Sequence, residues 1–168
     1  HILAKSANTI ICLLPHFRVN NDNVNFQPAI QMSKLVEIKS YLQSKTTPFN
    51  KLQILNTQYD EIRFDIEVVV NKDILDLPFY QQKLNEDIRK FLAPWAFDPS
   101  SLPSFNSQKI YMATIVDFID ELSYIHHIKS LKIYKNDQEQ FDEINTTSEI
   151  HLLTTAAEHT INVFEYGN

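Results

Sequence analysis

The chain has one glycine, Gly167, and one cysteine, Cys12, among its 168 residues. Phosphate-binding loops, dinucleotide fingerprints and nucleophile elbows all need glycine where the backbone turns sharply or approaches a ligand. Most of the common nucleotide-dependent enzyme classes are therefore disfavoured. A single cysteine excludes an internal disulfide and any multi-cysteine metal site. Because Cys12 lies in the apolar run TIICLLP, we expect a buried structural thiol there rather than a nucleophile.

The chain also lacks long hydrophobic runs and an excess of basic residues. No apolar run approaches the ~20 residues that a membrane helix needs. Residues 1–14 carry neither the positive charge nor the cleavage-like end of a secretory signal. The formal net charge is -6, which argues against nucleic acid or an anionic membrane as a partner, because both select basic surfaces. The chain starts at His1 rather than Met, so we expect a fragment of a longer protein.

Two groups of polar residues could supply chemistry, and neither has the pattern of a site. The six histidines are scattered, and the adjacent pair His126 and His127 would point to opposite faces of a strand. We therefore predict no metal and no cofactor. Asp117, Asp120 and Glu121 lie three and four residues apart on a predicted helix. They are the candidate residues of an alternative function, a stand-alone domain that binds a small ligand or acts as a hydrolase, although a solvated helix face is the preferred interpretation.

Hydrophobic periodicity predicts a mixture of strands and helices. Apolar and polar residues alternate in one segment, whose apolar residues are Ile62, Phe64, Ile66, Val68 and Val70. This period predicts a strand in a sheet that has one solvent-exposed face. The other predicted elements are strands at 9–15, 51–55 and 128–134, helices opening at Pro28 and spanning 79–93 and 112–122, a terminal hairpin from 149–155 and 160–164, and loops at 16–26, 98–107 and 136–148.

The order of these elements predicts an α+β fold, with helices on one face of a mostly antiparallel sheet. Ferredoxin-like sandwich units plus a C-terminal hairpin fit that order. We expect one compact module with three parts: a strand–helix–strand unit at 1–57, a strand–helix–helix–strand unit at 58–135, and a loop with the hairpin at 136–168.

Three longer segments follow one another in the middle of the chain: NTQYDEIRFDIEVVV, YQQKLNEDIRKFLAPWAFD and KIYMATIVDFIDELSYIHHIKSLKIY. Their order and spacing resemble the carboxy-terminal part of baseplate J-like proteins, the wedge components of contractile phage tails and of related injection systems. In that family a helix ends in a phrase similar to FLAPWAF here, and a phrase similar to KIY follows a loop. Asn106 stands where the family usually has a glycine in that loop.

The resemblance implies a structural role without chemistry. Such a module contacts other wedge proteins and copies of itself in a ring, assembles in the cytoplasm, and becomes part of a phage-tail-like particle. Aromatic residues are enriched at protein interfaces. The candidate interface residues in and beside the matched segments are Trp95, Phe97, Phe105, Tyr111 and Tyr124. For Trp95 a place in the core is the preferred interpretation, with Pro94 turning the chain so that Trp95 and Phe97 cap the core edge.

Overall fold

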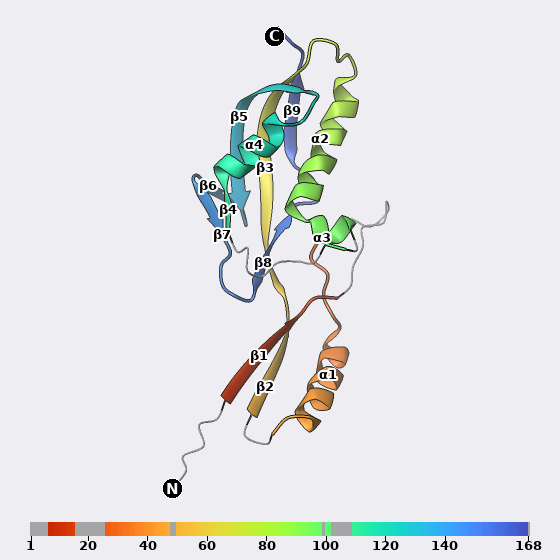
Figure 1. Cartoon of the computed structure of the whole chain (residues 1–168), viewed down its shortest axis with the longest axis vertical. Helices are drawn as coiled ribbons and strands as arrows, with labels where there is room; N and C mark the ends of the chain where they lie inside the picture. Colours follow the sequence, from red (N-terminus) through yellow and green to blue (C-terminus); the bar gives the residue numbers. More distant parts are fainter. Residues whose placement is uncertain (1–6, 16–25, 48–49, 99, 102–108, 168) are drawn as a thin grey trace. The chain divides into compact units, whose positions relative to one another are not determined.

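The computed structural model describes residues 7–15, 26–47, 50–98, 100–101 and 109–167 (Figure 1). The described residues form an α+β fold with mixed sheets that combine parallel and antiparallel pairings, so the predicted class is confirmed. The strands are β1 (Ala7–Leu13), β2 (Asn50–Asn56), β3 (Gln58–Val70), β4 (Lys109–Tyr111), β5 (Ile125–Lys135), β6 (Gln138–Gln140), β7 (Glu143–Asn145), β8 (His151–Thr155) and β9 (Thr160–Phe164). The helices are α1 (Met32–Ser44), α2 (Leu77–Leu92), α3 (Pro94–Phe97) and α4 (Met112–Asp120).

The chain divides into two compact units, which are described separately. The first unit contains residues 1–17 and 27–58, and the second contains residues 18–26 and 59–168. The first unit is a strand–helix–strand motif in which β1 and β2 pair in parallel and α1 packs mainly on β2. Adjacent parallel strands need a crossover connection, which α1 provides.

Helix α1 begins later than the predicted start at Pro28. The backbone N–H of Ile30 donates to Asn56 Oδ1 at 2.8 Å, and Asn56 Nδ2 donates back to the Ile30 carbonyl at 2.9 Å. This pair of bonds holds the segment before the helix against the end of β2. The helix therefore starts only at Met32.

The second unit is built around β3, which pairs with β5 in antiparallel and with β9 in parallel orientation. The strand order is β6-β5-β3-β8, with β9 also on β3. This order does not show a ferredoxin-like arrangement. The predicted alternation of β3 is confirmed, because Ile62, Phe64, Ile66, Val68 and Val70 are all fully buried.

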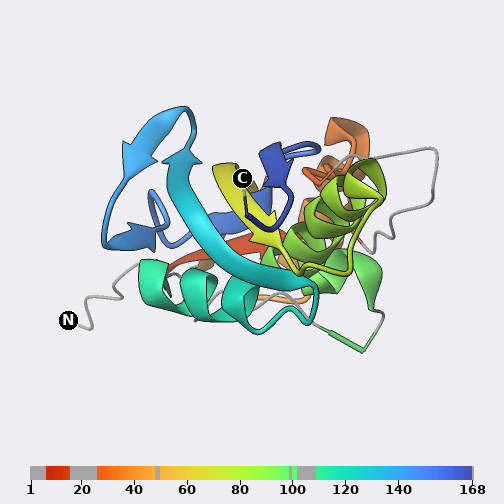
Figure 2. The same ribbon diagram turned by 90° about the horizontal axis from the view of Figure 1, so that it is seen from above.

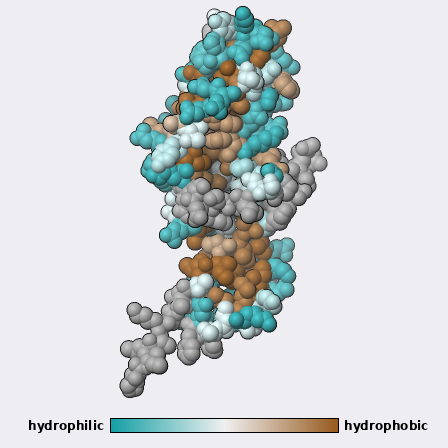
Figure 3. All heavy atoms as spheres, viewed as in Figure 1, coloured by the Kyte–Doolittle hydropathy of each residue, from teal (hydrophilic) through white to brown (hydrophobic). Residues whose placement is uncertain are grey.

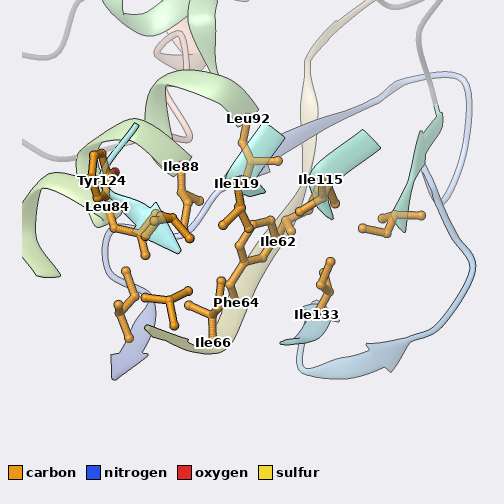
Figure 4. Packing of buried hydrophobic residues seen from close by; sticks show 14 of the residues in the cluster. Ile62, Phe64, Ile66, Leu84, Ile88, Leu92, Ile115, Ile119, Tyr124 and Ile133 are labelled. Atoms are coloured by element: carbon orange, nitrogen blue, oxygen red, sulfur yellow. The ribbon is translucent and has the colours of Figure 1, made fainter. Parts of the chain in front are cut away.

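Helices α2 and α4 cover the apolar face of this sheet (Figure 2). Asp76 caps α2, since its Oδ1 accepts the backbone N–H of Phe79 at 3.1 Å, and Pro78 occupies the first turn. The side chains of Leu84, Ile88 and Leu92 from α2 and of Ile115 and Ile119 from α4 meet those of β3 (Figure 4). Burial of this cluster is the main stabilising contribution to the second unit.

The predicted terminal hairpin is wrong. Strands β8 and β9 both lie along β3 instead of pairing with each other. Between them, the Ala156 N–H donates to the Ile62 carbonyl at 2.9 Å, and the Phe64 N–H donates to His159 Nδ1 at 3.1 Å. Residues 156–159 (AAEH) therefore stay hydrogen-bonded to β3 and do not form the turn of a hairpin.

Two predicted loops also need correction. The segment 136–148 contains β6 and β7, and the buried Asp60 carboxylate fixes its end by accepting the Thr147 N–H at 2.5 Å and the Thr147 hydroxyl at 2.7 Å. Residues 16–25 of the other loop lie outside the described residues. Its last residue, Phe26, is buried, because Arg89 and Phe97 pack against its ring.

Candidate functional site

Trp95 and Phe97 lie on the short helix α3, directly after α2. Pro94 occupies the first position of α3, where its missing N–H costs nothing. Trp95 is 8% exposed, and its indole Nε1 has no hydrogen-bond acceptor in the part of the chain that the structure describes. Phe97 is half-buried, with its ring centroid 5.9 Å from that of Phe26. The tryptophan therefore belongs to the core of this unit, and Phe97 reaches its edge.

Tyr124 connects the start of β5 to helix α2. It is 5% exposed, and its hydroxyl donates to Asp87 Oδ2 at 2.8 Å. The ammonium group of Lys83 lies 2.9 Å from the same oxygen and also above the Tyr124 ring. Burial and the hydrogen bond to the Asp87 carboxylate raise the pKa of Tyr124 well above its ordinary value. The phenol therefore stays protonated and acts as a fixed tie between two elements.

Tyr111 is the most exposed of the candidate residues that the structure describes. It ends β4 and is 52% exposed. Lys109 Nζ lies 5.3 Å from its ring centroid and 2.7 Å from Glu143 Oε2 on β7. This arrangement presents an aromatic ring beside an ion pair, which is typical of the edge of a protein interface. Phe105, the fifth candidate, lies outside the described residues.

The acidic residues Asp117, Asp120 and Glu121 are all exposed. The buried residues of α4 are Ile115 and Ile119, on the opposite side of the helix. None of the three acids lines the pocket formed by β1, α1 and β2 or the pocket beside Asn85 and His159. Among the residues that the structure describes, no group of three or more His, Cys, Asp or Glu side chains is placed to hold a metal ion. The geometry gives no support to a hydrolase that uses these carboxylates.

The larger pocket is a groove in the first unit, with a volume of about 580 Å³. Its walls come from all three elements of that unit: Thr9, Ile10, Lys39, Gln43, Lys51, Leu52 and Gln53. The Gln43 amide fixes one wall, because Nε2 donates to the Asn50 carbonyl at 2.9 Å and Oε1 accepts the Leu52 N–H at 3.4 Å. No motif of the sequence pointed to this groove, because it depends on the parallel pairing of β1 with β2.

A profile of the family named "Baseplate protein PVC11-like" matches residues 1–157 of the chain. The chain belongs to this family. It is accordingly a PVC11-like baseplate structural protein, and the predicted non-enzymatic role agrees with that membership. The predicted role as a baseplate protein is confirmed at this level.

The fold of this chain is similar to that of a chain in a solved assembly, the cryo-EM structure of the anti-feeding prophage (AFP) baseplate, 6-fold symmetrised. The TM-score is 0.62 at 10% sequence identity, and the match covers 90% of this chain. The chain spans only 30% of the length of the matched AFP chain. The search of curated proteins found no match. Within the described residues, no helix has both the length and the apolar character needed to cross a bilayer.

Proposed function

We propose that this PVC11-like chain is a J-like assembly module in the wedge of a contractile injection-system baseplate. It contacts other wedge proteins and copies of itself, assembles in the cytoplasm, and binds neither nucleic acid nor membrane. The family match over residues 1–157 carries this proposal. The order of the J-like segments between Leu55 and Tyr134 supports the finer assignment.

The candidate aromatic residues divide between two roles in this proposal. Phe97 and Tyr111 reach the surface and contribute direct contacts to a neighbouring protein. Trp95 and Tyr124 are buried and keep α3 and the start of β5 in the positions that present this surface. Phe105 contributes from the segment between α3 and β4.

The experiment that tests the proposal is complementation of a strain from which the coding region has been deleted. We expect electron micrographs of that strain to show no complete baseplate particles, and the wild-type chain to restore them. A triple variant, Asp117→Asn with Asp120→Asn and Glu121→Gln, should restore particles equally well, because these exposed acids do no chemistry in an assembly module. Normal particle numbers in the deleted strain would overturn the assembly function, and failure of the correctly folded triple variant would revive the hydrolase alternative.

A further inference from the structure

The two units of the chain differ sharply in charge. The first unit, residues 1–17 and 27–58, contains five lysines and one glutamate, a net charge of +4. The second unit contains ten basic and twenty acidic residues, a net charge of -10. The only acid of the first unit, Glu37, is already paired with Lys34 at 2.8 Å. A basic unit within an acidic chain indicates a local electrostatic preference that the overall charge of -6 conceals.

The groove of the first unit combines this basic charge with uncovered apolar surface. Lys39 and Lys51 line the groove, and neither forms an ion pair with any residue that the structure describes. Ile10, which also lines the groove, is 54% exposed. Figure 3 shows hydrophobic surface gathered over this unit. Contiguous apolar surface bordered by polar residues is typical of an interaction site.

Helix α1 extends this apolar surface beyond the groove. Val36 lies three residues before Lys39 and seven before Gln43, so all three share one face of the helix. Val36 is 57% exposed, and Met32, four residues earlier on the same face, is exposed as well. This one face of α1 is thus apolar in its first half and polar with a positive charge in its second.

Parallel sheets are normally covered on both faces, because the crossover connections place helices over them. In the first unit, α1 is the one helix that the described residues place against the two strands. A two-stranded sheet with a single covering helix buries little apolar surface. A further segment bound in the groove and along α1 would add apolar burial to this small unit.

We propose that the groove and the adjoining face of α1 bind an acidic, amphipathic segment of another protein in the baseplate. The inference rests on the proposed function, since it requires the chain to be inside the particle. Apolar residues of that segment pack on Ile10 and Val36, and its carboxylates pair with Lys39 and Lys51. A nucleic acid fits less well, because the first unit contains no arginine and the groove presents no aromatic ring for base stacking.

In the test, a photoreactive benzophenone amino acid replaces Val36 in the full-length chain. Purified particles that contain this chain are then photo-cross-linked. Cross-linked peptides are then sequenced by mass spectrometry. We expect one dominant adduct with a segment of a different particle protein, in which acidic and apolar residues alternate on one face. The same probe at Leu75, which is exposed in the second unit, serves as the positional control.

Two charge-reversal variants test whether the Val36 adduct depends on the lysines of the groove. Lys39→Glu with Lys51→Glu should lower the yield of the Val36 adduct by about tenfold, because like charges now face each other. Lys34→Glu with Lys45→Glu changes the net charge of the same unit equally, but neither residue lines the groove, so the yield should stay within about twofold. All four lysines are exposed, and circular dichroism checks that both variants are folded.

Four outcomes overturn the inference: an adduct only with copies of this chain, an adduct with nucleic acid, an adduct with a basic segment, or no adduct at Val36 in intact particles. Equal loss of yield in the two charge-reversal variants also overturns it. If the chain is absent from the particles altogether, the proposed function fails instead. The presence of the chain in the particle fraction thus separates the two failures.

Discussion

In the gap between β8 and β9, the side chain of His159 accepts a backbone hydrogen bond from β3 in place of a strand carbonyl. Nδ1 accepts the Phe64 N–H, so the ring proton is on Nε2, which lies 3.1 Å from Thr155 Oγ1. Burial, together with the positive charges of Arg89 and Arg63, lowers the pKa of His159 to about 4. The imidazole is therefore neutral in the folded chain at neutral pH.

The lowered pKa of His159 predicts that the folded chain loses stability in mild acid. A histidine whose pKa is depressed on folding favours the folded state above the unfolded pKa of about 6.5, and that contribution is lost as the pH falls towards 4. We expect the free energy of unfolding in urea to drop by about 2 kcal/mol between pH 7 and pH 5. His159→Gln should be less stable at pH 7 but should largely lack this drop, whereas the exposed control His127→Gln should retain it. A wild-type free energy that does not change between pH 7 and pH 5 would contradict the account.

Asp60 is a second buried polar residue on which the second unit depends. Besides the two bonds from Thr147, its carboxylate accepts Asn136 Nδ2 at 2.8 Å. Although burial alone would raise the pKa of Asp60, the hydrogen bonds from Thr147 and Asn136 lower it below the ordinary value. The carboxylate is thus ionised and joins the start of β3 to both ends of the segment 136–147.

Replacing this carboxylate should be costly. Asp60→Ala leaves buried donors without an acceptor, so we expect a loss of about 3 kcal/mol in the free energy of unfolding at pH 7. Asp73→Ala, in the exposed turn before α2, should change it by less than about 0.5 kcal/mol. Chemical denaturation of the purified variants measures both values. Equal stabilities for the two variants would mean that the Asp60 network does not hold the unit together.

Helix α2 is the element that closes the core of the second unit. Its buried stripe packs on β3, and its polar side holds β9 through Gln81 Nε2, which donates to the Ile161 carbonyl at 2.9 Å, and through Asn85 Oδ1, which accepts the His159 N–H at 3.0 Å. The helix therefore fixes both the apolar face of the sheet and its last strand.

A cavity under α2 should weaken the whole unit. We expect Ile88→Ala to lower the free energy of unfolding by about 2–5 kcal/mol, because the fully buried side chain leaves space that its neighbours fill only in part. Lys90→Ala, two residues away on the exposed side of the same helix, should have little effect. Thermal unfolding of the pair provides the comparison, and a similar shift in both midpoints would argue against this packing.

The elements that the sequence predicts well are those whose signal is local. The alternation of β3 and the helical periodicity of α2 each arise from residues that lie within a few positions of one another. The parallel pairing of β1 with β2 and the place of β9 on β3 depend on partners far away in the chain. Residues 156–159 (AAEH) have the composition of a turn, but the hydrogen bond between His159 and Phe64 keeps this segment attached to β3.

The same distinction holds for the candidate site. The aromatic candidates were found from local motifs, and a core position was the preferred interpretation for Trp95. The burial of Tyr124 depends on its contact with Asp87, which is distant in the chain. The groove of the first unit could not be found in this way, because Ile10, Lys39 and Lys51 become neighbours only when β1, α1 and β2 are assembled. The tight packing of Phe26 was missed for a similar reason, since its contact with Arg89 spans much of the chain.

At the scale of the whole molecule, the chain combines an acidic unit with a large apolar core and a small basic unit with an open groove. The acidic second unit has the large core that an independent domain needs for stability. The basic first unit has a small core and gains more apolar burial from further contacts. Such a division suits a component whose final structure is completed in an assembly. The PVC11-like family match gives that assembly its identity as a baseplate.

The claim that the chain is a component of a baseplate is tested most directly by sedimentation of the full-length, tagged protein from producing cells. The lysate is fractionated through a density gradient, and the fast-sedimenting fractions are imaged by negative stain. The account predicts that the tagged chain travels with particles that carry a tube and a baseplate. If the chain stays wholly in the slow fractions while such particles form normally, the chain is not a baseplate component.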